Sequence, residues 1–62
     1  MLRKGDVVRH WFAGVGRVIV PQRSPRDRVV RVLWNRSGQT GGAYAADCRL
    51  VRAAEPQDDS HD

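Results

Sequence analysis

The sequence has few of the residues that form disulfides, metal sites or membrane-spanning segments. Its 62 residues include a single cysteine, Cys48, so an internal disulfide is excluded. One cysteine and two histidines do not make a zinc site, and we predict no metal and no other cofactor. No apolar run approaches the roughly 20 residues of a membrane span, and the N-terminus lacks the apolar segment of a secretory signal. We therefore expect a cytoplasmic protein that makes no membrane contact.

Aromatic and acidic residues are also scarce. The only aromatic residues are Trp11, Phe12, Trp34 and Tyr44. The core is therefore expected to be thin, in a single domain near the lower size limit for unaided folding, where self-association is one source of extra stability. Residues 1–54 hold eleven Lys and Arg side chains against three aspartates, a net charge of +8, whereas residues 55–62 carry four carboxylates. We predict a basic folded domain over residues 1–54 and a disordered acidic tail over residues 55–62.

Alternating apolar residues predict an all-β chain of five short strands. The expected strands cover residues 6–11, 16–22, 28–35, 39–46 and 50–52, with a corner at 12–15 and a helical turn at 47–49. In the third strand, Val30, Val32 and Trp34 share one face, which we assign to the core. Gly41 and Gly42 in the fourth strand predict a bulge or a close approach of the backbone. No segment is long enough for a substantial helix.

The order of the motifs resembles a known family of small barrels. The run KGDVVRH at residues 4–10 is followed by FAGVGRV at 12–18, by VRVLW at 30–34 and by a terminal Leu50-Val51. This pattern resembles the Tudor-like modules of bacterial transcription and repair proteins. Those modules include the RNA-polymerase-interacting domains of CarD-type regulators and transcription-repair coupling factors, and the C-terminal module of UvrD-type helicases. The resemblance covers residues 3–52 and implies a five-stranded SH3-like (Tudor-like) barrel that docks onto RNA polymerase.

A cationic surface beside exposed aromatic side chains is the expected binding site. Trp11 and Phe12 flank the first corner, and we expect one of them to cap the core and the other to be partly exposed. Arginine side chains around the exposed ring would steer an anionic partner toward it. The candidate partner-binding residues are Arg9, Trp11, Phe12, Arg17, Arg28 and Arg31.

No catalytic site is predicted, and we expect a non-enzymatic protein. His10 has no nucleophile or second histidine near it in the sequence, so a hydrogen-bonded structural role is favoured. Arg49 beside Cys48 could lower the pKa of that thiol, although a half-buried structural thiol is the favoured role. The opening motif is also similar to that of plasmid-type dihydrofolate reductase, a tetrameric SH3-like barrel. The strand Val-Gln-Ile-Tyr that lines the pore of that enzyme has no counterpart here beyond Tyr44.

Three functions fit the same basic surface. The leading hypothesis is a module that docks onto bacterial or phage nucleic-acid machinery, with RNA polymerase as the favoured protein partner. One alternative is direct binding of DNA or RNA, with Trp11 or Phe12 stacking on a base. The other is a small structural or assembly protein of a phage particle, since stand-alone barrels of this size also resemble small phage-encoded proteins.

Overall fold

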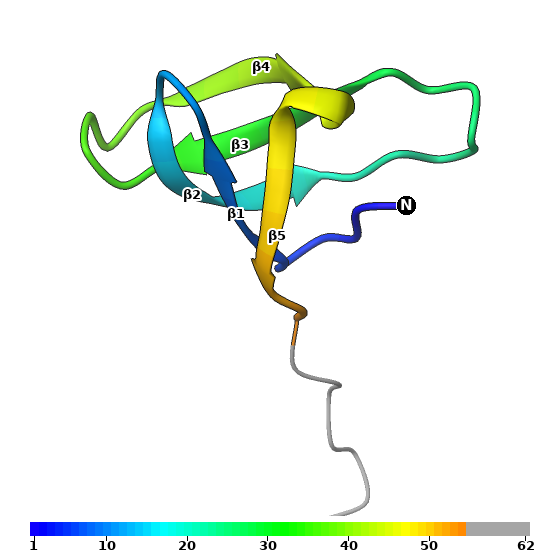
Figure 1. The fold of residues 1–62 in the computed structure, drawn as a ribbon, viewed down its shortest axis with the longest axis horizontal. Helices are drawn as coiled ribbons and strands as arrows, with labels where there is room; N and C mark the ends of the chain where they lie inside the picture. Colours follow the sequence, from blue (N-terminus) through cyan, green and yellow to red (C-terminus); the bar gives the residue numbers. More distant parts are fainter. Residues whose placement is uncertain (55–62) are drawn as a thin grey trace, which may run out of the picture.

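The chain forms one antiparallel sheet in a computed structural model, which describes residues 1–54 (Figure 1). Its elements are β1 (Val7–His10), β2 (Gly14–Val20), β3 (Val29–Trp34), β4 (Thr40–Tyr44), the 3-10 turn η1 (Ala45–Asp47) and β5 (Cys48–Arg52). The predicted all-β class is confirmed, while the tail predicted at residues 55–62 lies outside the described residues. No helix within residues 1–54 has the length and apolar character needed to cross a membrane.

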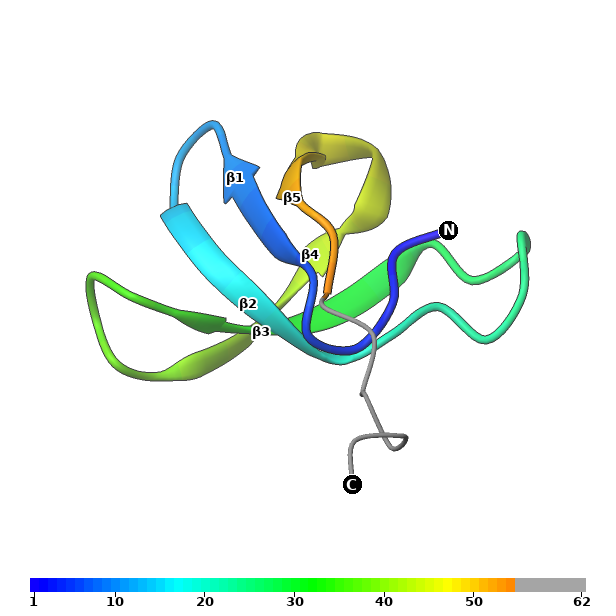
Figure 2. The ribbon, with the colours of Figure 1, turned by 90° about the horizontal axis from the view of Figure 1, so that it is seen from below.

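The sheet is a meander with one returning strand. Its strand order is β4-β3-β2-β1-β5, so the first four strands are neighbours in sequence and β5 comes back to pair with β1. The strands curl around a common interior rather than lying flat (Figure 2). No ladder joins β4 to β5 within residues 1–54, because η1 separates these two edge strands. The described sheet is therefore open along this line, where the sequence predicted a closed barrel.

Several strand limits differ from the prediction. β2 begins at Gly14, two residues earlier than expected, because Gly14 pairs directly with His10 and adopts a φ of +87°. This left-handed backbone is accessible to glycine without steric penalty. The helical turn lies at Ala45–Asp47 rather than at 47–49, so β5 starts at Cys48 and gains two residues.

The core is small and consists mainly of valine. Its buried side chains are Val8, Val18, Val30, Val32 and Trp34, which confirms the inward face predicted for the third strand. Gly16 lies opposite Trp34 in the β2–β3 ladder. A Cβ atom at Gly16 would lie 2.5 Å from Val32 Cγ1 and 2.8 Å from Trp34 Cε3. Because Gly16 has no side chain, the backbone of β2 can pack directly against the indole ring of Trp34.

A buried carboxylate connects the two ends of the described chain. Asp6 is only 4% exposed. Its Oδ2 accepts a hydrogen bond from the main-chain N–H of Arg3 at 2.8 Å, and its Oδ1 accepts one from the N–H of Ala54 at 2.7 Å. The main-chain carbonyl of Asp6 accepts a third from the N–H of Val18 at 2.9 Å. One residue thus joins the N-terminal turn, β2 and the segment that follows β5.

Replacing a fully buried valine tests the core. We expect Val32→Ala to lower the free energy of unfolding by about 2 kcal/mol, because it removes methyl groups and leaves a cavity. The matched control is Val29→Ala on the same strand, whose side chain is 53% exposed and which should change stability much less. Urea and thermal denaturation measure both effects, and equal losses for the two variants would contradict the assignment of the inward face.

Removing the carboxylate tests the connection made by Asp6. We expect Asp6→Ala to lower the free energy of unfolding by about 2 kcal/mol or more, since two part-buried N–H groups lose their acceptor. Asp27→Ala is the control, because Asp27 Oδ2 accepts a single exposed bond from the N–H of Arg23. Hydrogen exchange at the amide of Ala54 should accelerate in Asp6→Ala alone. An unchanged exchange rate there would contradict the proposed role.

Candidate binding surface

The two aromatic residues after β1 are both exposed. Trp11 is 77% and Phe12 is 74% exposed, so the prediction that one of them caps the core is wrong. Trp34 already fills the interior at the neighbouring part of the sheet. Strand alternation also ends with β1 at His10, and the turn at residues 11–13 carries both rings away from the sheet. We call residues 11–13 the aromatic turn.

His10 fixes the conformation of the aromatic turn. Its Nδ1 accepts hydrogen bonds from the main-chain N–H groups of Phe12 and Ala13, both at 3.1 Å. The imidazole stacks on Trp11, with ring centroids 5.5 Å apart and planes 24° apart, and meets Trp34 edge-on at 5.7 Å. The structural, hydrogen-bonded role predicted for His10 is confirmed. Nδ1 is therefore the atom through which the imidazole holds the turn.

The aromatic turn borders a hollow that contains two arginines. The Trp11 and Phe12 rings are neighbours, with centroids 5.7 Å apart. Arg9 and Arg49 lie directly opposite each other in the β1–β5 ladder and therefore project from the same face. The hollow is lined by Arg9, Trp11, Ala46, Asp47, Cys48 and Arg49, and we call it the aromatic hollow. It combines a large apolar ring with two planar cations and the single carboxylate of Asp47.

Arg49 is the site residue that the sequence analysis missed. The predicted helical turn at 47–49 hid it, whereas the structure places it in β5 with its side chain on the outer face. Cys48 points the other way and packs against the core. Burial, together with the negative charge of Asp47, raises the pKa of the Cys48 thiol above its ordinary value. The half-buried position favoured for this thiol is confirmed, the alternative in which Arg49 lowers its pKa is not found, and Cys48 is a poor nucleophile.

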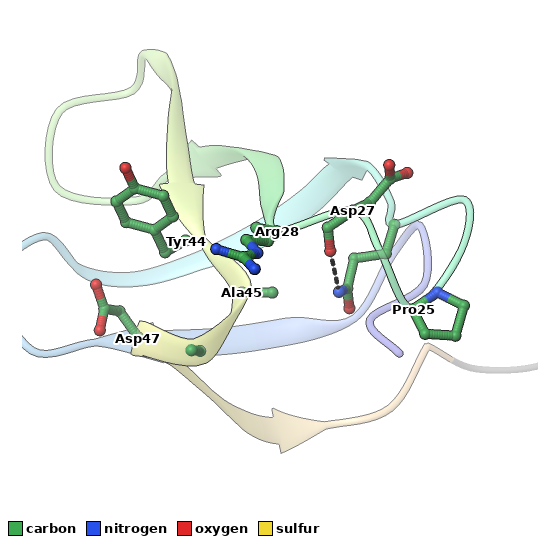
Figure 3. A pocket seen from close by; sticks show the side chains of 8 residues that line it. Pro25, Asp27, Arg28, Tyr44, Ala45 and Asp47 are labelled. Carbon is green, nitrogen blue, oxygen red and sulfur yellow. Dashed lines mark hydrogen bonds between the residues drawn. The ribbon is translucent and has the colours of Figure 1, made fainter.

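The other predicted arginines divide between two regions. Arg17 lies opposite Val7, and Arg31 lies opposite Gly42, which places both on the outer face of the sheet with Arg9. Arg28 lies elsewhere. It lines a separate hollow between the β2–β3 connection and the end of β4, together with Tyr44 (Figure 3).

The outer face of the sheet is strongly basic. Its exposed arginines are Arg9, Arg17, Arg31, Arg49 and Arg52. The three aspartates of residues 1–54 do not lie on the strands of this face. Asp6 is buried, Asp27 lies in the β2–β3 connection and Asp47 lies in η1. An anionic partner can therefore approach the sheet without meeting a carboxylate in its centre.

Within residues 1–54, no group of three or more His, Cys, Asp or Glu side chains is arranged to hold a metal ion. Comparisons with protein families, with curated proteins and with solved structures return no significant match to this chain. The surface consists of a fixed aromatic turn, a hollow beside it and a basic sheet face.

Two substitutions of His10 test whether its hydrogen-bond acceptor, and not only its aromatic ring, holds the aromatic turn. We expect His10→Phe to lower the free energy of unfolding by about 1 kcal/mol and to accelerate hydrogen exchange at the amides of Phe12 and Ala13, because both lose their acceptor. His10→Asn keeps an acceptor close to the position of Nδ1 and should protect these amides better than His10→Phe does. NMR measures the exchange of both amides in each variant. Slow exchange in His10→Phe would disprove the role of Nδ1 as their hydrogen-bond acceptor.

Proposed function

We propose that the curled sheet is a small SH3-like (Tudor-like) barrel that serves as a binding module and not as an enzyme. The connectivity supports this proposal, since a four-stranded meander, a 3-10 turn and a fifth strand returning to β1 follow one another in the order expected of such a barrel. The chemistry supports it as well. His10 uses Nδ1 to hold the aromatic turn, and the raised pKa of Cys48 disfavours its thiolate, so neither side chain is prepared for catalysis.

The partner that fits best is a protein of the nucleic-acid machinery, with bacterial RNA polymerase favoured by the family resemblance. The exposure of Trp11 and Phe12 on a turn held by His10 is the observation that carries this proposal. Two large exposed rings form an apolar surface that a partner can cover, and tryptophan is the residue most enriched at the centres of protein interfaces. Because the turn is already fixed, little conformational entropy is lost on binding.

Arginines supply the rim of the proposed interface. Arg9 and Arg49 border the aromatic hollow, and the guanidinium group of each can form paired hydrogen bonds with a carboxylate. The complementary surface is therefore an apolar pocket surrounded by Asp or Glu side chains. The remaining arginines of the outer face contribute long-range attraction, which raises the association rate more than the affinity.

Direct nucleic-acid binding predicts a different response to salt. A surface that neutralises several phosphates releases counterions, so its affinity falls by about a factor of ten or more between about 50 and 200 mM salt. An interface with an apolar centre loses much less, since only its rim is screened. An assembly role in a phage particle would instead appear as binding to further copies of this chain or to other particle proteins.

Binding to purified bacterial RNA polymerase tests the proposal. We expect Trp11→Ala to weaken the complex by about 2 kcal/mol, because it removes the apolar centre of the interface. The control is Tyr44→Ala, which removes another exposed ring that lies in a separate hollow and should leave the affinity unchanged. Biolayer interferometry at two salt concentrations measures both. Tight binding to short DNA with a steep salt dependence, in the absence of polymerase binding, would overturn the proposal in favour of the nucleic-acid alternative.

A further inference from the structure

A third hollow lies at the opposite end of β1 from the aromatic turn. It is lined by Lys4, Gly5, Val7, Arg17, Arg52, Ala53 and Ala54. Three residues with positively charged side chains thus line it, from the N-terminal turn, β2 and β5, and no acidic residue among residues 1–54 lines the hollow. It is distinct from the aromatic hollow, with which it shares no lining residue.

A β-bulge brings Arg52 to this hollow. Val8 pairs with Leu50, but Val7 pairs with Arg52, so the β1–β5 ladder skips Val51. In a regular ladder Val51 would lie opposite Val7, and a valine would occupy the place of the guanidinium on the outer face. Bulges commonly redirect a side chain in this way near functional sites. Here the bulge replaces an apolar neighbour of Val7 with a cation.

Arg17 and Arg52 lie on either side of Val7. Each is the direct cross-strand partner of Val7, one on β2 and the other on β5. Their backbones are therefore two strand spacings apart, about 10 Å, which is a distance that two long side chains can close around a small anion. Because both are cations, an anion placed between them is attracted by both.

The backbone around this hollow is held in place. The N–H of Gly5 donates to the carbonyl of Val18 at 2.8 Å, which ties the turn carrying Lys4 to β2. Asp6 accepts the N–H of Ala54 at 2.7 Å, which ties the segment after Arg52 to the same turn. Both carboxylate oxygens of Asp6 are occupied by main-chain donors. The three cations are therefore anchored on backbone that does not have to reorganise for binding.

We propose that this hollow, lined by Lys4, Arg17 and Arg52, is a binding site for a phosphate monoester, such as the phosphate of a nucleotide or of a nucleic-acid terminus. A carboxylate has one charge and two oxygens, which one arginine can satisfy. A phosphate monoester carries close to two negative charges and three oxygens. Three cations, partly offset by the buried charge of Asp6, match that charge, and their approach from three chain segments matches the three oxygens.

The site goes beyond the proposed docking function and does not rest on it. A module that docks through its aromatic turn onto nucleic-acid machinery would present this hollow at the other end of β1, where a phosphate of the substrate or product of that machinery can be held. The phosphate contact uses neither Trp11 nor Phe12, so the two functions can be tested separately.

The first test is an NMR titration of the full chain with inorganic phosphate, at constant ionic strength and with acetate as the comparison anion. We expect saturable shifts at the amides that border the hollow, at Gly5 and Ala53, with phosphate and not with acetate. Arg17→Gln should weaken phosphate binding by roughly fivefold or more, because it removes a charge-assisted contact. Arg26→Gln is the matched control, since it removes the same charge from the β2–β3 connection outside the hollow.

The second test distinguishes the sources of the phosphate group. A nucleoside monophosphate and a short single-stranded oligonucleotide with a 5′ phosphate should both compete with inorganic phosphate, whereas the same oligonucleotide without a terminal phosphate should compete at least about fivefold less well. Trp11→Ala should leave all of these affinities unchanged, which separates this site from the docking surface. Equal weakening by Arg17→Gln and Arg26→Gln, or equal shifts with phosphate and acetate, would overturn the proposal.

Discussion

The carboxylate of Asp6 is the contact on which the arrangement of this small domain depends. No ladder joins β4 to β5 in the described part of the chain, so the two ends of residues 1–54 meet through the β1–β5 pairing and through the bonds of Asp6 to Arg3 and Ala54. The core supplies only four valines and one tryptophan. Domains of this size have a net stability of only several kcal/mol, so two part-buried charge-assisted bonds are a large share of the total.

At both ends of β1, one side chain accepts hydrogen bonds from two main-chain N–H groups. Asp6, before the strand, accepts two main-chain N–H groups, and His10, its last residue, accepts two more. Each side chain holds a turn that would otherwise be loosely tethered. One turn carries Lys4 and the other carries Trp11. A strand of four residues thus fixes two separate surface features, and both binding proposals depend on this rigidity, because ordering a turn during binding would reduce the affinity.

The sequence predicted the features that depend on local pattern. Alternation identified Val30, Val32 and Trp34 as the inward face of β3, and this holds because β3 lies between β2 and β4 and must bury one side. One exposed ring was expected, but the exposure of both Trp11 and Phe12 could not be predicted, since strand alternation does not extend into a turn.

The two bulges, between Val7 and Val8 and between Val18 and Val20, depend on the pairing of distant strands, which a single segment does not encode. Arg49 was missed because the helical turn was predicted at 47–49 and not at Ala45–Asp47, which left Arg49 outside the expected strand. The site residues that are local in sequence were found, and those that β5 brings from a distance were not.

The distribution of charge on the sheet follows from these long-range pairings. β5 places Arg49 beside Arg9 and Arg52 beside Val7, so the returning strand adds two cations to a face that already carries Arg17. Like charges in neighbouring cross-strand positions destabilise a sheet, and a thin core gives little stability to offset this. A sequence selected for stability alone would alternate the signs of these side chains. The retained repulsion, together with two exposed rings on a fixed turn, is accounted for if this face is occupied by an anionic partner when the protein works.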